Sequence, residues 1–405
     1  MEYVQERIST FHDYGGAHPS APVEQATVVV PLAERDQGSR ATEQVLRTLE
    51  AVDPGRVVVP LRADEDGVAE VAAWLESFDL DLTVLWCTAP AVESLLSDHG
   101  LDGSAGKGRD VWLGLGVAAQ SPYVVVHDAD ALTYDERHVP KLLSPLAEGY
   151  EFSKGYYARV EDRKLYGRLF RLFIEPLVAA LDTHSDAEFV DYLGSFRYAL
   201  AGEFGMTGDL ARSIRAPRGW GLELGTLGDA FAEVGFDGSA QVDLGIHEHE
   251  HRSVEGAGGL GDMCDEVAET LFTVAEEHGV DPSYDQLRER YRDHAGRLVR
   301  QYAGDAAFND FEYDSQAERE QVDTYAGSIQ PPGTDTRLPT WETASLEPKN
   351  LAERSADALA ERPLDLDPAH LLFLRRDTAR RQDVADLARP DADADRAEGA
   401  VGGGV

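Results

Sequence analysis

The chain has 405 residues, enough to bury one large core or two smaller ones. Its 75 acidic and 37 basic residues give a formal net charge of −38, and a surface of that charge repels nucleic acid and anionic membranes, so we expect neither as a partner. Only five of the basic residues are lysines, a pattern typical of proteins that work in high salt; this predicts a halophilic source, with an acidic mesophilic protein as the alternative.

Strands and helices alternate through the first 130 residues. Short, nearly all-apolar runs predict strands at Thr27–Leu32, Arg56–Leu61, Leu82–Trp86 and Tyr123–Val126. Helical patterns lie between them, through about Leu49, at Val68–Leu75, at Val92–Leu96 and over residues 110–119. Apolar strands separated by helices predict a parallel sheet covered on both faces, in a nucleotide-binding α/β unit.

The pattern becomes mixed after residue 150. We expect a strand at Phe152–Val160, a helix from about Lys164 to Leu181, a helix at Leu222–Val234 and a strand at Gln241–Leu244. Residues 262–303 predict two helices with a break at Gly279–Pro282, and another helix is expected near 350–361. The tail after Arg389, rich in Asp, Ala and Gly, predicts disorder.

The two cysteines, Cys87 and Cys264, fit no metal-binding spacing and are interpreted as buried or free thiols in a reducing compartment. The sequence has no apolar run of membrane-spanning length and no signal-peptide stretch. We therefore expect a cytoplasmic protein.

Two features at strand and helix ends point to a phosphate ligand. Asp128 and Asp130 follow the strand at Tyr123–Val126, and two close carboxylates favour a divalent cation that carries phosphate, although a solvated turn gives the same pattern. Lys107 lies between two glycines before a predicted helix, where its ammonium can reach an anion; a flexible surface turn is the alternative. The spacing of a P-loop is absent.

A local excess of basic residues indicates an anionic substrate. The segment 154–171 has six basic residues against two acidic ones, and in a helix Lys164, Arg168 and Arg171 share one face. Ion pairs with the many surrounding carboxylates are the alternative.

Glu223 and three histidines are further candidates. Glu223 starts a helix after a Gly-Trp-Gly turn, where it could act in a site or simply complement the helix dipole. His247, His249 and His251 alternate with glutamates, so an extended segment would put all three on one face and could bind zinc. Alternatively, one histidine completes the shell of a cation held by Asp130, or the segment is a solvated loop.

Together, motifs between residues 26 and 255 resemble the glucosyl-3-phosphoglycerate synthases, which are retaining glycosyltransferases of the GT-A fold. They occur in the family's order: Val30-Pro31-Leu32-Ala33-Glu34, Gly106-Lys107-Gly108, Asp128-Ala129-Asp130, Lys154-Gly155-Tyr156, Ala201-Gly202-Glu203-Phe204, the turn Gly219–Gly225 and the segment Gln241–His249.

The resemblance implies an α/β fold: a Rossmann-like mixed sheet flanked by helices, with a helical C-terminal extension. The expected units are an N-terminal extension (1–25), a nucleotide-sugar-binding half (26–130), an acceptor-binding and catalytic half (131–260), a helical region (261–325), a Pro-rich and helical extension (326–389) and a disordered tail (390–405).

The resemblance also implies roles for individual residues. Pro31, Leu32, Ala33, Glu34, Lys107 and Asp128 would bind the nucleotide sugar, and Asp130 and His249 would hold Mg²⁺ or Mn²⁺. Glu223, with Asp130, would act at the reacting sugar, and Gly167, Arg168, Arg171 and His251 would bind the acceptor. The expected reaction moves a hexose, glucose above all, from a UDP- or GDP-sugar to 3-phosphoglycerate, a phosphorylated small-molecule acceptor, in a homodimer.

The acceptor loop departs from the family pattern, which reads Gly-Arg-Val-Thr-Glu. Here Phe170 replaces the threonine and cannot donate a hydroxyl hydrogen bond, although Arg171 could compensate, and His251 replaces an asparagine. Another sugar donor, mannose included, or another anionic acceptor is therefore the main alternative. A sugar nucleotidyltransferase is disfavoured, because it would need a Gly-rich basic loop after the first strand, which residues 31–38 lack. A non-catalytic nucleotide-sugar-binding protein is the remaining alternative.

Overall fold

A computed structural model describes residues 5–362 except 184, 186 and 251–258. Its centre is a nine-stranded sheet in the order β1-β11-β7-β10-β6-β2-β4-β3, with β5 paired to β4. The strands are β1 (Ser9–Phe11), β2 (Ala26–Val29), β3 (Leu32–Ala33), β4 (Arg56–Arg62), β5 (Leu82–Trp86), β6 (Tyr123–Val126), β7 (Phe152–Ala158), β10 (Phe204–Thr207) and β11 (Ser239–Ile246).

All strands of this sheet are parallel except β10, which is antiparallel to both of its neighbours, β6 and β7. The predicted parallel sheet of the first half is therefore confirmed. The strands β2, β6, β7 and β11 end at one edge, and β10 begins there, since Phe204 pairs with Val126 at the end of β6. Residues that follow these four strands or precede β10 gather at this edge, where ligands bind in open α/β sheets.

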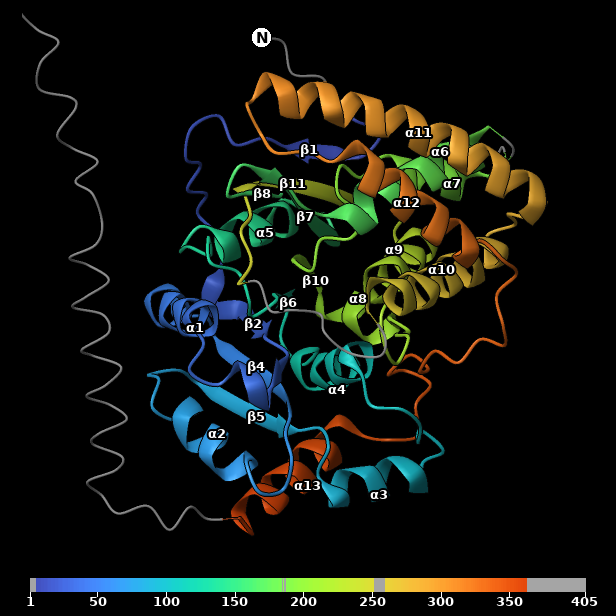
Figure 1. Cartoon of the computed structure of the whole chain (residues 1–405). Helices are drawn as coiled ribbons and strands as arrows, with labels where there is room; N and C mark the ends of the chain where they lie inside the picture. Colours follow the sequence, from blue (N-terminus) through green and yellow to red (C-terminus); the bar gives the residue numbers. More distant parts are fainter. Residues whose placement is uncertain (1–4, 184, 186, 251–258, 363–405) are drawn as a thin grey trace, which may run out of the picture.

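Helices cover the sheet (Figure 1). They are α1 (Arg40–Val52), α2 (Val68–Leu75), α3 (Pro90–Asp98), α4 (Lys107–Ala118), α5 (His138–Ala147), α6 (Glu175–Asp182), α7 (Glu188–Gly194), α8 (Gly208–Ser213), α9 (Leu222–Glu233), α10 (Gly259–Glu277), α11 (Tyr284–Phe308), α12 (Ser315–Tyr325) and α13 (Pro348–Ala360). Figure 1 shows α11 and α12 at one end of the molecule and α3 and α13 at the other. Within the described residues, no helix is long and apolar enough to cross a membrane.

Several predicted elements differ from the structure by a few residues at their ends, and two differ in kind. The strand predicted at Thr27–Leu32 is split into β2 and β3 at Pro31, which lacks the N–H that a ladder needs. The helix predicted from Lys164 is wrong in its first part, because Lys164–Leu165 form β9 and pair with β8 (Val160–Glu161). Asp162 and Arg163 make the tight turn between them with positive φ values of 45° and 59°. A π-helical turn, Phe170–Ile174, then leads into α6.

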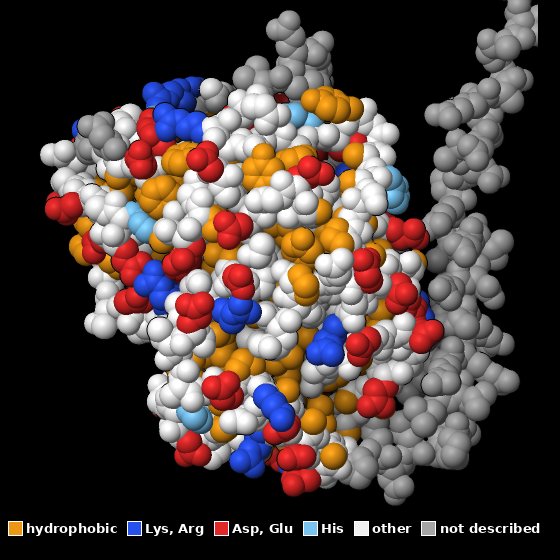
Figure 2. Space-filling model, turned by 180° about the vertical axis from the view of Figure 1, so that it is seen from behind, with side chains coloured by type: hydrophobic (Ala, Val, Ile, Leu, Met, Phe, Trp, Pro, Cys, Tyr) orange, Lys and Arg blue, Asp and Glu red, His pale blue; other side chains and the backbone are white. Residues whose placement is uncertain are grey.

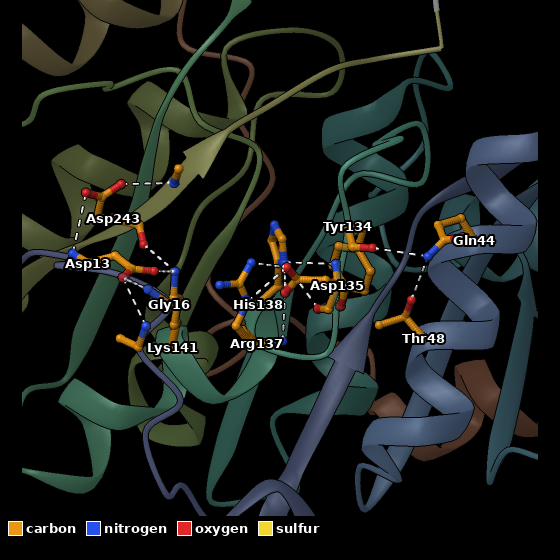
Figure 3. A network of polar contacts seen from close by, with 12 residues as sticks. Asp13, Gly16, Gln44, Thr48, Tyr134, Asp135, Arg137, His138, Lys141 and Asp243 are labelled. Carbon is orange, nitrogen blue, oxygen red and sulfur yellow. Dashed lines mark hydrogen bonds and ion pairs between the residues drawn. The ribbon is translucent and has the colours of Figure 1, made fainter. Parts of the chain in front are cut away.

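The N-terminal extension adds an edge strand that the sequence did not predict. β1 pairs in parallel with β11, and a polar network holds the chain that follows it (Figure 3). The carboxylate of Asp13 accepts hydrogen bonds from the amides of Gly15 and Ala17, both at 2.9 Å, and pairs with the ammonium of Lys141 at 2.7 Å. Lys141 also donates to the Asp243 carbonyl of β11 at 3.0 Å, which ties the extension to α5 and the sheet.

The C-terminal extension packs back onto the first half. The rings of Trp341 and Trp112 stack 4.1 Å apart, and each indole N–H donates to a backbone carbonyl on the other segment, at 2.8 Å. In α13, the predicted helix near 350–361, Ser355 accepts a hydrogen bond from the Trp86 amide of the edge strand β5 at 2.8 Å. The tail predicted to be disordered lies outside the described residues.

Candidate active site

Asp130 and His249 meet at the ligand-binding edge of the sheet, through a short β-bridge. The Leu132 amide donates to the Glu248 carbonyl at 2.8 Å, and the Glu250 amide donates to the Asp130 carbonyl at 2.9 Å. This bridge places Nδ1 of His249 3.4 Å from Oδ2 of Asp130. The structure thus brings together the two residues predicted to hold a cation.

The atoms of this pair fit a divalent cation. Oδ1 of Asp130 and Nε2 of His249 are buried and have no hydrogen-bond partner among the described residues. Burial acts to raise the pKa of Asp130, but the contact with His249 and the charge of Lys107 prevail and hold that pKa below its usual range. An ionised carboxylate oxygen and an imidazole nitrogen suit Mg²⁺ or Mn²⁺, with water and phosphate oxygens as further ligands.

The described residues give no support to the three-histidine zinc cluster. Within the described residues, no group of three or more His, Cys, Asp or Glu side chains could hold a metal ion. The ring of His247 is instead buried and stacks on Tyr157, with 4.1 Å between the centroids. His251, also predicted to bind the acceptor, lies outside the described residues. The pairing of one histidine with Asp130 is the alternative that the geometry favours.

Lys107 joins two further predicted residues, Asp128 and Glu223. Its ammonium lies 2.7 Å from Oδ1 of Asp128 and 3.3 Å from Oε1 of Glu223. Burial acts to lower the pKa of Lys107, yet the two carboxylates raise it overall, so the lysine stays charged. Lys107 begins α4 and Glu223 lies in the first turn of α9, which places both near helix N-termini that favour anions.

The glycines on either side of Lys107 permit a close backbone approach. A Cβ at Gly106 would lie 2.3 Å from the Arg218 carbonyl oxygen, and a Cβ at Gly108 would lie 2.0 Å from that of Pro217. Only glycine lets the start of α4 pack against this loop, which continues into the Gly-Trp-Gly turn and α9. The glycines therefore bring Lys107 to Glu223.

The segment Pro31–Glu34 follows β2 at the same edge of the sheet. Leu32 is buried in β3, and the Ala33 amide donates to the Asp36 carboxylate at 2.7 Å. Glu34 accepts a hydrogen bond from the Asp64 amide at 2.8 Å, so one of its oxygens is held by the protein. These contacts fix the backbone at the edge where a nucleotide base is expected.

Lys154 and the segment 201–204 belong to two of the motifs named above, but no individual role was predicted for them. Lys154 is buried in β7, where its ammonium donates to the Ala201 carbonyl at 2.6 Å, and burial lowers its pKa to about 8. Gly202 passes so close to Asp128 that a Cβ there would lie 2.3 Å from Oδ2. Burial and the charge of Asp128 raise the pKa of Glu203, which is 1% exposed. The segment 201–204 therefore packs directly against the carboxylate of Asp128.

The predicted acceptor residues do not form one helical face. Gly167 has a φ of +71°, and a Cβ there would lie 2.9 Å from the Tyr198 hydroxyl. Arg168 is exposed and lines a groove of about 600 Å³ with Tyr313 and Asp314. Arg171 was expected to bind the acceptor, but its guanidinium pairs with Glu318 at 2.8 Å and donates to the Tyr166 carbonyl at 2.9 Å. Its buried donors are thus used within the protein.

The chain is similar to known enzymes over most of its length, although no protein-family model matches it. It is 32% identical over 395 residues to glucosyl-3-phosphoglycerate synthase of Methanococcoides burtonii, covering 88% of this chain and 97% of that protein. The crystal structure of glucosyl-3-phosphoglycerate synthase from Mycobacterium tuberculosis in complex with Mg²⁺ and uridine diphosphate has 25% identity and a TM-score of 0.51, over 68% of this chain and 88% of that one. Mannosyl-3-phosphoglycerate synthase from Rubrobacter xylanophilus has 25% identity and a TM-score of 0.50, over 64% of this chain and 76% of that one. The expected GT-A fold is confirmed.

Proposed function

Because the chain belongs to the glucosyl-3-phosphoglycerate synthase family, we propose that it transfers glucose from UDP-glucose to 3-phosphoglycerate with retention of configuration. The cofactor is Mg²⁺ or Mn²⁺, as the Mg²⁺ and uridine diphosphate of the similar Mycobacterium tuberculosis structure suggest. The product is glucosyl-3-phosphoglycerate.

The contact between Asp130 and His249 carries this proposal. The two side chains come from distant parts of the chain, and each presents a buried, unpartnered atom. We assign them to the cation. When bound there, a divalent cation supplies positive charge that neutralises the departing nucleoside diphosphate, so no acid is needed to protonate it.

The positions of the other predicted donor residues support the proposal. Lys107 and Asp128 lie together beside the cation pair, and we assign them to the nucleotide together with Pro31, Leu32, Ala33 and Glu34. Glu223 is 11% exposed and lies in the first turn of α9, which suits a residue beside the sugar and the acceptor. Since Glu223 already faces the Lys107 cation at 3.3 Å, its charge is partly neutralised, which disfavours it as a covalent nucleophile. A same-face attack stabilised by fixed charges and dipoles fits this arrangement better.

A coupled assay tests the donor and the acceptor together. Purified protein in 2 M KCl is incubated with Mg²⁺, 3-phosphoglycerate and UDP-glucose, and uridine diphosphate release is measured. We expect release that depends on 3-phosphoglycerate and a product with an α-glucosidic bond by NMR. Uridine diphosphate release at the same rate without 3-phosphoglycerate would contradict the proposal and indicate a hydrolase. No release at all would also contradict it and indicate a binding protein.

Mannosyl transfer is the second candidate, because one similar structure is a mannosyl-3-phosphoglycerate synthase. The same assay with GDP-mannose, GDP-glucose and ADP-glucose decides the donor. We expect UDP-glucose to have the highest kcat/KM. A higher value for GDP-mannose would assign the chain to mannosyl transfer.

The predicted homodimer stays a proposal, which light scattering of the purified protein tests.

A further inference from the structure

Most of the basic residues of segment 154–171 are used within the protein. Three form ion pairs with residues 310–318, namely Arg163 with Asp310, Lys164 with Glu312 at 3.1 Å and Arg171 with Glu318 at 2.8 Å. The ammonium of Lys154 donates to the Ala201 carbonyl. Among the four arginines of the segment, Arg159 and Arg168 make no ion pair with a carboxylate of the described residues. In a chain with 75 acidic residues, two arginines of one segment without an ion pair single out a place for an anion.

The two arginines differ in burial. Arg168 is exposed, so water solvates its charge, whereas Arg159 is half-buried and its Nε is a buried donor without a hydrogen-bond partner. A partly desolvated guanidinium that makes no ion pair, and that keeps one donor without a hydrogen-bond acceptor, is stabilised further when an anion pairs with it. Arg159 is therefore the better candidate for a ligand contact.

Arg159 lies between the acceptor loop and the cation pair. It follows the end of β7, where the His247 amide donates to the Ala158 carbonyl at 2.9 Å. Its Cδ is 3.5 Å from the position of a Cβ on Gly167, and the Tyr198 hydroxyl is 2.9 Å from the same position. The guanidinium interacts with the hydroxyl of Tyr198, and its charge acts on Asp130.

A wall of neighbouring imidazole and aromatic rings connects these residues. Centroid distances are 4.4 Å from His249 to His247, 4.1 Å from His247 to Tyr157, 4.9 Å from Tyr157 to Tyr198 and 4.6 Å from Tyr198 to Phe170. The wall runs without a break from the cation pair to the acceptor loop. Phe170 is buried against Tyr198, so the hydroxyl available at this end of the wall belongs to Tyr198.

We propose that Arg159, assisted by the Tyr198 hydroxyl, binds an anionic group of the acceptor. This inference rests on the proposed function, since it takes the acceptor to be 3-phosphoglycerate. A guanidinium can fork onto a carboxylate or a phosphate, and the adjoining hydroxyl adds one more hydrogen bond. In this arrangement Arg159 determines acceptor specificity and takes no part in donor binding.

The test compares Arg159→Gln with Arg163→Gln, a matched control at the neighbouring exposed turn. Titration calorimetry gives the Kd of 3-phosphoglycerate for protein loaded with Mg²⁺ and uridine diphosphate, and steady-state assays give both KM values. For Arg159→Gln we expect an acceptor Kd and KM about 10- to 100-fold higher, with the UDP-glucose KM within about twofold of wild type. Arg163→Gln should match wild type, and Arg159→Lys should recover part of the affinity.

Each other outcome has a definite meaning. An acceptor Kd unchanged in Arg159→Gln, or raised equally in Arg163→Gln, overturns the inference. A wild type that binds 3-phosphoglycerate more tightly than Arg159→Gln but does not transfer glucose contradicts the proposed function alone. A wild type that does not bind 3-phosphoglycerate overturns both. If Arg159→Gln does not fold, Tyr198→Phe provides the test, with an expected several-fold rise in acceptor Kd. Titrations with glycerate and glycerol 3-phosphate show whether Arg159 contacts the carboxylate or the phosphate.

Discussion

At the scale of single residues, the site depends on the contact between Asp130 and His249. We expect Asp130→Ala and His249→Ala each to lower kcat/KM by about 10³-fold, because each removes one of the two side chains proposed to hold the cation, and with it several kcal/mol of charge stabilisation. Activity should also respond more weakly to added Mg²⁺. Rates measured over a Mg²⁺ titration check this, with Asp209→Ala, at an 87% exposed side chain, as the control. Either variant keeping a tenth of wild-type kcat/KM at low Mg²⁺ would contradict the assignment.

The residue types at the site could be predicted from the sequence, but their partners could not. The strand before Asp128 and the glycines around Lys107 are local signals, and both residues lie where those signals indicated. Arg171 was expected to bind the acceptor, whereas its ion-pair partner Glu318 lies 147 residues away in the sequence, and no local pattern reveals such a pair. Arg159 is one of six basic residues in its segment, and what distinguishes it is visible only in the fold: a buried Nε without a hydrogen-bond partner and the contact with Tyr198.

At the scale of elements, the C-terminal extension stabilises the helix that carries Lys107. Trp341 stacks on Trp112 of α4, and a Cβ at Gly116 would lie 2.3 Å from its ring. We expect Trp341→Ala to lower the free energy of unfolding by about 3–5 kcal/mol, since it empties a buried site and breaks a hydrogen bond. Chemical denaturation measures this, and Trp220→Ala is the control because Trp220 is 41% exposed. A loss below 1 kcal/mol would show that the extension is only loosely attached.

The N-terminal extension should be held in a pH-dependent way. The hydrogen bond from Lys141 is the main cause that keeps the pKa of Asp13 below its usual range, with the amides of residues 15–17 assisting. A lowered folded-state pKa gives stability that is present above the unfolded pKa of about 3.9 and is lost as the pH falls below it. We expect wild type to melt several degrees above Asp13→Asn from pH 7 to pH 5, and the difference to shrink below about pH 4. A constant difference down to pH 3 would contradict this role of the charge.

Elements with a strong apolar period could be predicted closely, and short or polar ones could not. The predicted bounds of α2 and β5 match the structure, because continuous apolar runs specify buried parallel strands and amphipathic helices. β1 has only three residues, too few for a periodic pattern, and it depends on β11 and the Asp13–Lys141 pair. The turn at Asp162 and Arg163 was missed because its charged residues also suit a helix surface.

At the scale of the whole molecule, one sheet unites the two predicted halves. The boundary predicted at residue 130 lies at the site itself, where β6 of the first half pairs with β10 of the second. The residues that we assign to the donor come from one side of this boundary, whereas His249, Glu223 and Arg159 come from the other. The same edge of the sheet therefore holds the residues proposed to bind the donor, the cation and the acceptor, which suits a direct transfer between two bound substrates.

The net charge of −38 leads to a prediction about salt. Figure 2 shows carboxylates spread over the visible face, with cations in smaller groups. Their mutual repulsion disfavours the compact state at low ionic strength, and the Debye length falls from about 10 Å at 0.1 M to about 3 Å at 1 M salt. We therefore expect the melting temperature to rise steeply between 0.1 M and 1 M KCl and to level off above that.

As a matched control, the triple variant Glu76→Lys, Glu289→Lys and Asp293→Lys changes the charge by two at each of three exposed sites, from −38 to −32. The triple variant should have a higher melting temperature than wild type at 0.1 M KCl, and added salt should raise its melting temperature by less. Equal salt gains in both proteins would show that ion exclusion, rather than screening of these charges, stabilises the fold.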